Sequence, residues 1–137
     1  MIVIDTHVLV WVAEDSPRVG EIARETIARA SKETGIHVSA ITPWEIAMLA
    51  QKGRLTLRQE VGVWIDAALA LAGVRLAPIT PAIAVDSVRL PGTLHADPAD
   101  RLIIATARRL GFPLLTADRA VLAYAAAGHV AVADASL

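Results

Sequence analysis

The chain contains 137 residues, a length that fits one globular domain with its own hydrophobic core, so we expect residues 1–137 to form a single domain. It has no cysteine, which excludes disulfide bonds, zinc–thiolate sites and a cysteine nucleophile and suits the reducing conditions of the cytoplasm, where we expect the protein. The formal net charge of -1 gives no overall attraction to nucleic acid, so any such binding requires a local basic patch.

Apolar residues are abundant in this sequence, at 55% of the chain, with a mean hydropathy of +0.51. Arg, Asp or Glu interrupts every long apolar stretch, so none has the length of a membrane span. Asp5 lies within the first apolar run and argues against a signal peptide. We therefore expect no membrane association and attribute the excess apolar surface to contacts with a partner chain.

Strand-like and helix-like segments alternate from the start of the chain. Met1–Asp5 predicts a buried strand and Thr6–Ala13 a helix. Ser16 followed by Pro17 predicts the N-terminus of another helix, which ends at Gly35. The next predicted elements are a strand at Ile36–Ala40, a helix from Thr42 to about Gly53, a helix at Arg58–Ala72 and a strand at Val74–Ile79.

The second half continues the alternation. Its predicted elements are a helix at Pro81–Leu90, an irregular and mobile loop at Pro91–Ala96, a helix at Asp97–Leu110, a strand at Leu114–Thr116, a helix at Arg119–Ala126 and a strand at Val130–Ala133. Strands that alternate with helices form a parallel sheet with helices on both faces. The sequence therefore predicts an α/β fold, a three-layer α/β/α sandwich with a central parallel sheet.

Carboxylates follow the strand-like segments at several points. Asp5, Glu45, Asp100 and Asp118 each lie at a strand end or in the first turn of the helix that follows. A parallel sheet gathers such positions at its carboxyl edge, where open α/β folds place their sites. Clustered carboxylates need a cation between them, and oxygen ligands without His or Cys favour Mg²⁺ or Mn²⁺.

Each of these acids also has a structural explanation as part of a helix cap. Asp5 and Asp118 precede predicted helices, and Thr42 with Glu45 fits a capping box. Asp97 before Pro98 fits a cap followed by a first-turn proline, and Asp100 then lies where the helix dipole favours an anion. The clustering at successive strand ends favours the metal site, although the caps explain each residue alone.

Four segments in this order resemble the PIN-domain ribonucleases, and in particular the VapC-type toxins of bacterial toxin–antitoxin pairs. They are Asp5-Thr6 after an apolar strand, the helix start Trp44-Glu45-Ile46, HADPADRLIIATA at His95–Ala107 and LLTAD at Leu114–Asp118. The resemblance runs from Met1 to about Val132. It implies a metal-dependent endoribonuclease with Mg²⁺ or Mn²⁺ as cofactor, an RNA substrate, a cognate antitoxin and a homodimer.

The resemblance also implies individual site residues. Asp5, Glu45 and Asp100 match the first three acids of the family, and Asp118 matches the variable fourth, which reaches metal through water. The hydroxyl groups that match family residues supporting the acids are those of Thr6 and Thr116. Asp97 is an additional acid one turn before Asp100, for which we favour the helix cap over a supporting role at the metal.

Basic residues depart from the family pattern at one position. Many relatives carry Lys one turn after the second acid, where this chain has Leu49, which leaves substrate choice open. Candidate RNA-binding residues are Arg101, Arg108, Lys52 and Arg54, although a solvated helix face explains each equally well.

We expect the histidine and tryptophan residues to have structural roles. Among the four histidines, His7 is the best exception because it lies beside Asp5, and His95 lies in the loop before Asp97. Trp11, Trp44 and Trp64 are expected in the core or an interface, and Trp11 with the first helices is the predicted oligomer face.

Two other functional classes share acids at strand ends. A receiver-like domain that accepts phosphate on Asp requires paired acids after the first strand, where this chain has Asp5-Thr6, and a later strand-end Lys. A haloacid-dehalogenase-type phosphatase requires a second Asp where His7 stands. A PIN scaffold without catalysis, acting through protein contacts, is a further alternative that the intact acid set disfavours.

Overall fold

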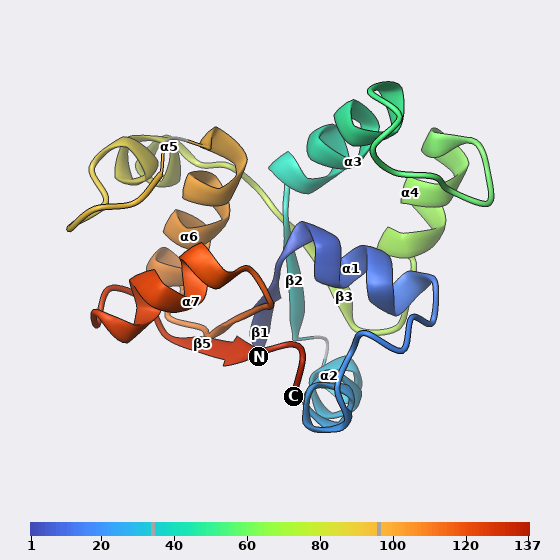
Figure 1. Ribbon diagram of the computed structural model, residues 1–137, viewed down its shortest axis with the longest axis horizontal. Helices are drawn as coiled ribbons and strands as arrows, with labels where there is room; N and C mark the ends of the chain where they lie inside the picture. The colour runs from blue at the N-terminus through green and yellow to red at the C-terminus, as the bar shows by residue number, and fades with distance from the viewer. Residues whose placement is uncertain (34, 96) are drawn as a thin grey trace.

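The computed structural model describes residues 1–33, 35–95 and 97–137 (Figure 1). Within these ranges five strands form one sheet, in the order β3-β2-β1-β4-β5, and every neighbouring pair is parallel. The strands are β1 (Ile2–Ile4), β2 (Ile36–Ser39), β3 (Val74–Ala77), β4 (Leu114–Thr116) and β5 (Val132–Asp134). The parallel sheet confirms the α/β class predicted from the alternating pattern.

Helices cover both faces of this sheet (Figure 1). Those of the described residues are α1 (Thr6–Ala13), α2 (Glu21–Lys32), α3 (Ile41–Gln51), α4 (Val61–Leu69), α5 (Pro81–Val88), α6 (Pro98–Leu110) and α7 (Arg119–Ala126). Buried residues of α1, α2, α3 and α4 share one hydrophobic cluster, and those of α6 and α7 share another. The three-layer α/β/α arrangement is therefore as predicted.

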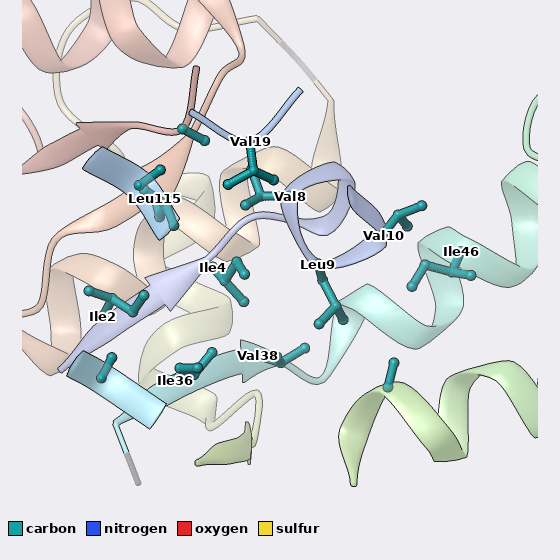
Figure 2. Packing of buried hydrophobic residues seen from close by; sticks show 14 of the residues in the cluster. Ile2, Ile4, Val8, Leu9, Val10, Val19, Ile36, Val38, Ile46 and Leu115 are labelled. Atoms are coloured by element: carbon teal, nitrogen blue, oxygen red, sulfur yellow. The ribbon is translucent and has the colours of Figure 1, made fainter. Parts of the chain in front are cut away.

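Alternating side chains of β1 divide between these two clusters. Ile2 and Ile4 pack into the cluster beneath α1, α3 and α4, which Figure 2 shows, whereas Val3 packs against α6 and α7. Successive residues of a strand point to opposite faces, so a strand covered on both faces must be apolar throughout. This explains the uninterrupted apolar run before Asp5.

The strand order reverses at β1, which lies between β2 and β4. Successive crossovers lead from β1 to β2 and β3 on one side, and from there to β4 and β5 on the other. Such a reversal opens a crevice at the carboxyl ends of the central strands. The crevice lies here where Asp5 follows β1 and where Thr116 ends β4.

Three helix starts differ from the predictions, and one of them is that of α4, which was expected from Arg58 but begins at Val61 with Glu60 as its N-cap. The helix expected from Ser16 begins at Glu21, because the Ser16 hydroxyl accepts a hydrogen bond from the Arg18 amide (3.2 Å) and stabilises a turn instead. Gly20 caps α2 at a point so close to Leu137 that a Cβ would lie 2.1 Å from its carbonyl carbon. Helix α3 begins at Ile41, one residue before the predicted cap.

The predicted mobile loop Pro91–Ala96 is irregular as far as His95, and Ala96 lies outside the described residues. None of the helices in the described parts of the chain is long and apolar enough to cross a membrane.

Candidate active site

Asp5 is the most deeply buried acid of the site, with 3% of its surface exposed. It follows β1 and precedes α1, and its Oδ1 accepts a hydrogen bond from the Thr6 amide at 2.8 Å. Its Oδ2 accepts a hydrogen bond from the Thr116 hydroxyl at 2.6 Å, which links the ends of β1 and β4. A buried carboxylate requires such donors, and together they fix its orientation.

Glu45 lies in the first part of α3, but it does not form the capping box that the sequence also allowed. The helix starts at Ile41 with no side-chain cap, and Thr42 is fully buried within it. The Thr42 hydroxyl lies 3.0 Å from the Thr6 hydroxyl instead. Glu45 is therefore free to face the crevice, where it is half-buried.

Burial raises the pKa of Glu45, and the neighbouring carboxylates of Asp5 and Asp97 raise it further, against a hydrogen bond from the Thr6 side chain. A raised pKa means that the charged form is poorly stabilised by its surroundings. Glu45 therefore lies in the same region of negative potential as Asp5, which follows β1, and Asp97, which precedes α6.

Asp97 and Asp100 belong to the start of α6. Asp97 is the N-cap, and its Oδ1 accepts hydrogen bonds from the amides of Ala99 (3.0 Å) and Asp100 (3.4 Å), which agrees with the favoured interpretation. Its position is still close to the metal candidates: one carboxylate oxygen each of Glu45, Asp97 and Asp100 lies within 4.8 Å of the others. The cap therefore does not exclude a supporting role at a cation.

Asp100 has the most strongly shifted pKa of the site. Burial and, after it, the four neighbouring carboxylates of Asp5, Asp97, Glu45 and Asp118 together raise this pKa to about 8. Every charge that contributes to this shift is negative, so a cation in the crevice would relieve it. The cluster thus has the electrostatic character of a cation site.

Asp118 caps α7, since its Oδ1 accepts a hydrogen bond from the Val121 amide at 3.1 Å. The helix cap that the sequence predicted for Asp118 is therefore present. Its own amide donates to the Thr116 hydroxyl at 3.1 Å, which in turn donates to Asp5. Thr116 thus joins two of the acids, and Asp118 lies near enough to Asp100 to raise its pKa.

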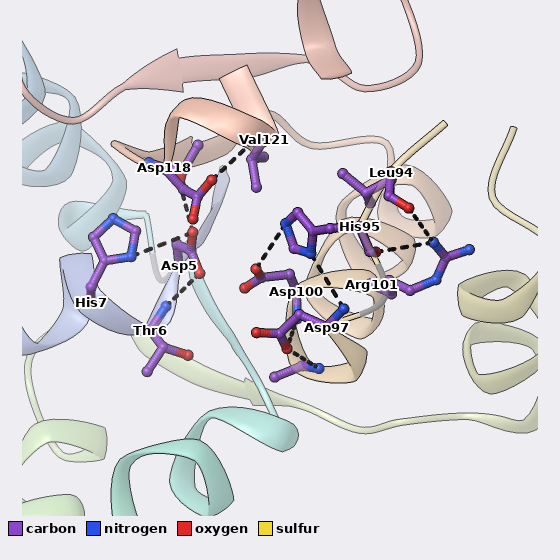
Figure 3. Close-up of polar contacts among 12 residues, drawn as sticks. Asp5, Thr6, His7, Leu94, His95, Asp97, Asp100, Arg101, Asp118 and Val121 are labelled. Atoms are coloured by element: carbon purple, nitrogen blue, oxygen red, sulfur yellow. Dashed lines mark hydrogen bonds and ion pairs between the residues drawn. The ribbon is translucent and has the colours of Figure 1, made fainter. Parts of the chain in front are cut away.

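Two histidines flank the acids, as Figure 3 shows. His7 Nδ1 lies 3.6 Å from an oxygen of Asp5, and His95 Nε2 lies 3.3 Å from an oxygen of Asp100. From the sequence, we had expected both histidines to be structural. The only indication of a position near the site was that His7 lies close to Asp5, and His95 close to Asp97, along the chain. His37 and His129 instead stack against Phe112 and Tyr124, away from the acids.

Two of the three candidate RNA-binding arginines, Arg101 and Arg108, have structural contacts. Arg101 donates from its guanidinium group to the carbonyl oxygens of Ser87 (2.8 Å), Val88 (3.5 Å), Leu94 (3.4 Å) and His95 (3.4 Å). Arg108 donates to the carbonyl oxygen of His129 and remains exposed.

Lys52 and Arg54 are exposed at the C-terminal end of α3, with Lys52 as its C-cap. Glu45 is near the opposite end of this helix, and seven residues of helix span roughly 10 Å. Leu49, where the family resemblance led us to expect Lys, is half-buried on the same helix.

The tryptophans differ in their surroundings. Trp64 is in the core with 5% exposure and donates from Nε1 to Glu14 at 3.1 Å, whereas Trp44 is 56% exposed beside Glu45. Trp11 is half-buried, packs edge-on against His7 and lies under the Arg18 guanidinium. Trp44 is therefore not a core residue.

Comparison with known proteins identifies the family. Residues 2–127 match the model of the PIN domain family. The chain is 36% identical over 118 residues to Ribonuclease VapC22 of Mycobacterium tuberculosis, covering 86% of this chain and 87% of that protein. The protein therefore belongs to the PIN domain family, as the resemblance of its motifs indicated.

Solved structures show the same fold. The structure of VapBC2 from Rickettsia felis bound to a promoter DNA fragment matches with a TM-score of 0.70 and 14% identity, over 97% of this chain and 98% of that one. A toxin–antitoxin complex from Klebsiella pneumoniae matches with a TM-score of 0.55 and 20% identity, over 86% of this chain and 87% of that one. At these identities the likeness concerns the fold.

Proposed function

We propose that the protein is a metal-dependent endoribonuclease that acts as the toxin of a toxin–antitoxin pair. The observation that carries this proposal is the cluster of carboxylates at the carboxyl edge of β1 and β4, in which the pKa of Asp100 is raised to about 8. The 36% identity to a protein named as a ribonuclease supports the reaction.

The donors in the crevice fit a hard divalent cation. They are carboxylate oxygens, which Mg²⁺ and Mn²⁺ prefer, and those of Glu45, Asp97 and Asp100 lie within 4.8 Å of one another. Asp5, Glu45 and Asp100 would hold the ion directly, and Asp97 and Asp118, whose Oδ1 atoms are engaged in caps, would support it. When bound, Mg²⁺ or Mn²⁺ supplies an activated water and neutralises charge on the phosphodiester.

The chain itself prepares the site for this chemistry. The Thr6 amide and the Thr116 hydroxyl orient the Asp5 carboxylate by donating to its two oxygens, at 2.8 Å and 2.6 Å. Burial and neighbouring carboxylates raise the pKa values of Asp100 and Glu45, so a cation that compensates their charge would favour the loss of their protons. Hydrolysis by water requires no protein nucleophile.

RNA, an antitoxin and a second copy of the chain are the proposed partners. A structurally similar chain occurs in a toxin–antitoxin complex, which supports the antitoxin. Exposed apolar side chains are available for protein contacts, such as Trp44 on α3 (56% exposed) and Val88 on α5 (79%). The predicted oligomer face around Trp11 remains a prediction, and Val8, Leu9 and Val10 of the same helix are buried inside the protein.

A receiver-like module is not supported, because the chain belongs to the PIN family and the cluster lacks the strand-end Lys that such a module requires. An experiment distinguishes a nuclease from a PIN scaffold without catalysis. Purified protein is incubated with a structured RNA and Mn²⁺ or Mg²⁺, with EDTA, and as the Asp100→Asn and Asp66→Asn variants.

We expect EDTA to abolish cleavage and Asp100→Asn to reduce kcat by at least about 100-fold, equivalent to roughly 3 kcal/mol. Asp66 is an exposed acid of α4, so its substitution controls for the loss of one carboxylate and leaves the rate unchanged. Cleavage that survives in Asp100→Asn or in EDTA would refute the proposed mechanism.

A further inference from the structure

His7 connects two parts of the site that are distant in sequence. It lies on α1, two residues after Asp5, and its Nε2 accepts a hydrogen bond from the Ala117 amide at 3.2 Å. Ala117 lies between Thr116, which donates to Asp5, and Asp118, which faces the cluster. The imidazole thus holds the connection between β4 and α7 against the start of α1.

The hydrogen bond to Ala117 also defines the tautomer of the ring. A backbone amide can only donate, so Nε2 must be the acceptor and a neutral imidazole carries its proton on Nδ1. Nδ1 lies 3.6 Å from Oδ2 of Asp5, which is longer than a hydrogen bond but directs the N–H dipole toward that carboxylate. Figure 3 shows the ring facing Asp5 from α1.

This arrangement excludes His7 as a metal ligand or general base in the observed geometry. One ring nitrogen is occupied by the Ala117 amide and the other bears the proton, so neither offers a free lone pair. Edge-on packing against Trp11, with ring centroids 5.0 Å apart, restricts the ring further. A fixed ring with both nitrogens engaged acts on its neighbours, as residues around metal ligands commonly do.

We propose that His7 is a positioning residue of the nuclease site, which holds the segment from Thr116 to Asp118 in the geometry that binds the divalent cation. The proposal rests on the proposed metal-dependent function. The atom responsible is Nε2 of His7, which accepts the hydrogen bond from Ala117, because this contact is the one at hydrogen-bond distance.

Two amide substitutions distinguish the two nitrogens of the ring. The side chain of His7→Gln reaches the Nε2 position and can accept from Ala117, whereas that of His7→Asn reaches only the Nδ1 position. His7→Ala removes both contacts. His129→Gln is the matched control, since His129 also stacks on an aromatic ring, that of Tyr124, but lies outside the site.

Mn²⁺ affinity is measured by titration calorimetry, and cleavage of RNA is measured as a function of Mn²⁺ and of RNA. In His7→Ala and His7→Asn we expect the Kd for Mn²⁺ and the Mn²⁺ concentration for half-maximal rate to rise by about 10-fold. His7→Gln should stay within about 3-fold of the wild type. KM for RNA should not change in any of them, a separation that general loss of structure would not produce.

The proposal is overturned if His7→Gln binds Mn²⁺ no better than His7→Asn, or if His7→Ala binds it as the wild type does. If a thermal melt shows that His7→Ala is not folded, the comparison of His7→Gln with His7→Asn still tests the proposal, because these two side chains differ by one methylene group. A wild type that binds Mn²⁺ but cleaves no RNA would refute the nuclease function alone. A wild type that binds no Mn²⁺ would refute both proposals.

Discussion

At the scale of single residues, the carboxyl group of Asp100 responds most strongly to its surroundings. Its pKa rises from an ordinary value of 3.8 to about 8, mainly through burial and then through the charges of Asp5, Asp97, Glu45 and Asp118. Between roughly pH 4 and pH 8, Asp100 therefore binds a proton more readily in the folded metal-free protein than in the unfolded chain. Its own contribution to stability falls as pH rises through that window.

Asp100→Asn should consequently stabilise the metal-free protein, because an amide cannot ionise. We expect the free energy of unfolding in EDTA to exceed that of the wild type by about 1–3 kcal/mol at pH 8, and by clearly less at pH 5. Urea unfolding at both pH values measures this difference, with Asp66→Asn as the control for removal of an exposed acid. Equal or lower stability of Asp100→Asn at pH 8 would show that Asp100 is not destabilised by its neighbours.

At the scale of elements, Arg101 joins α6 to the end of α5. Its guanidinium group donates to the carbonyl oxygens of Ser87 and Val88, which belong to the last turn of α5, and to those of Leu94 and His95 in the following loop. The last carbonyl groups of a helix lack partners within it, so a side chain that satisfies them stabilises the helix end. This contact gives Arg101 a structural role, whatever it contributes to RNA binding.

Replacement of Arg101 by Met should lower the free energy of unfolding by about 1–3 kcal/mol, since the carbonyl groups of Ser87 and Leu94 lose a charged donor in part-buried contacts. Amide exchange in α5 should accelerate in the same variant. Arg109→Met removes only an exposed pair with Asp86 and should change stability by less than about 1 kcal/mol. If instead Arg101→Met is as stable as the wild type and only RNA binding weakens, the structural assignment is wrong.

Element boundaries were predictable where the local chemistry is self-contained. Asp97 and Pro98 start α6 and Gly111 ends it with φ of 73°, as the sequence indicated. The start of α2 was mispredicted because Ser16 and Pro17 are typical of a helix start, while contacts with the C-terminal residues, such as the 2.9 Å hydrogen bond from Ile22 to Leu137, fix the helix further along. Contacts between residues so far apart in the chain leave no pattern in the local sequence.

At the scale of the whole molecule, the strand order explains why acids from distant segments meet. Asp5 and Asp118 lie 113 positions apart in the chain yet follow neighbouring parallel strands, and Thr116 connects them. The sequence indicated Asp5, Glu45 and Asp118 because each follows a strand-like run, whereas Asp100 lies on α6, which follows α5 and a loop and not the expected strand end. It did not indicate that Thr42 bonds to Thr6, or that backbone amides fix the rings of His7 and His95, since those contacts depend on side-chain packing.

The claim that the clustered carboxylates form a divalent-cation site is tested most directly by calorimetric titration of the metal-free wild type with Mn²⁺ at pH 7, in two buffers of different ionisation enthalpy. With the pKa of Asp100 at about 8, most of this group is protonated before the ion binds, so binding should release close to one proton. The expected result is saturable binding whose heat depends on the buffer. Absence of binding, or binding with no proton released, would contradict this description of the site.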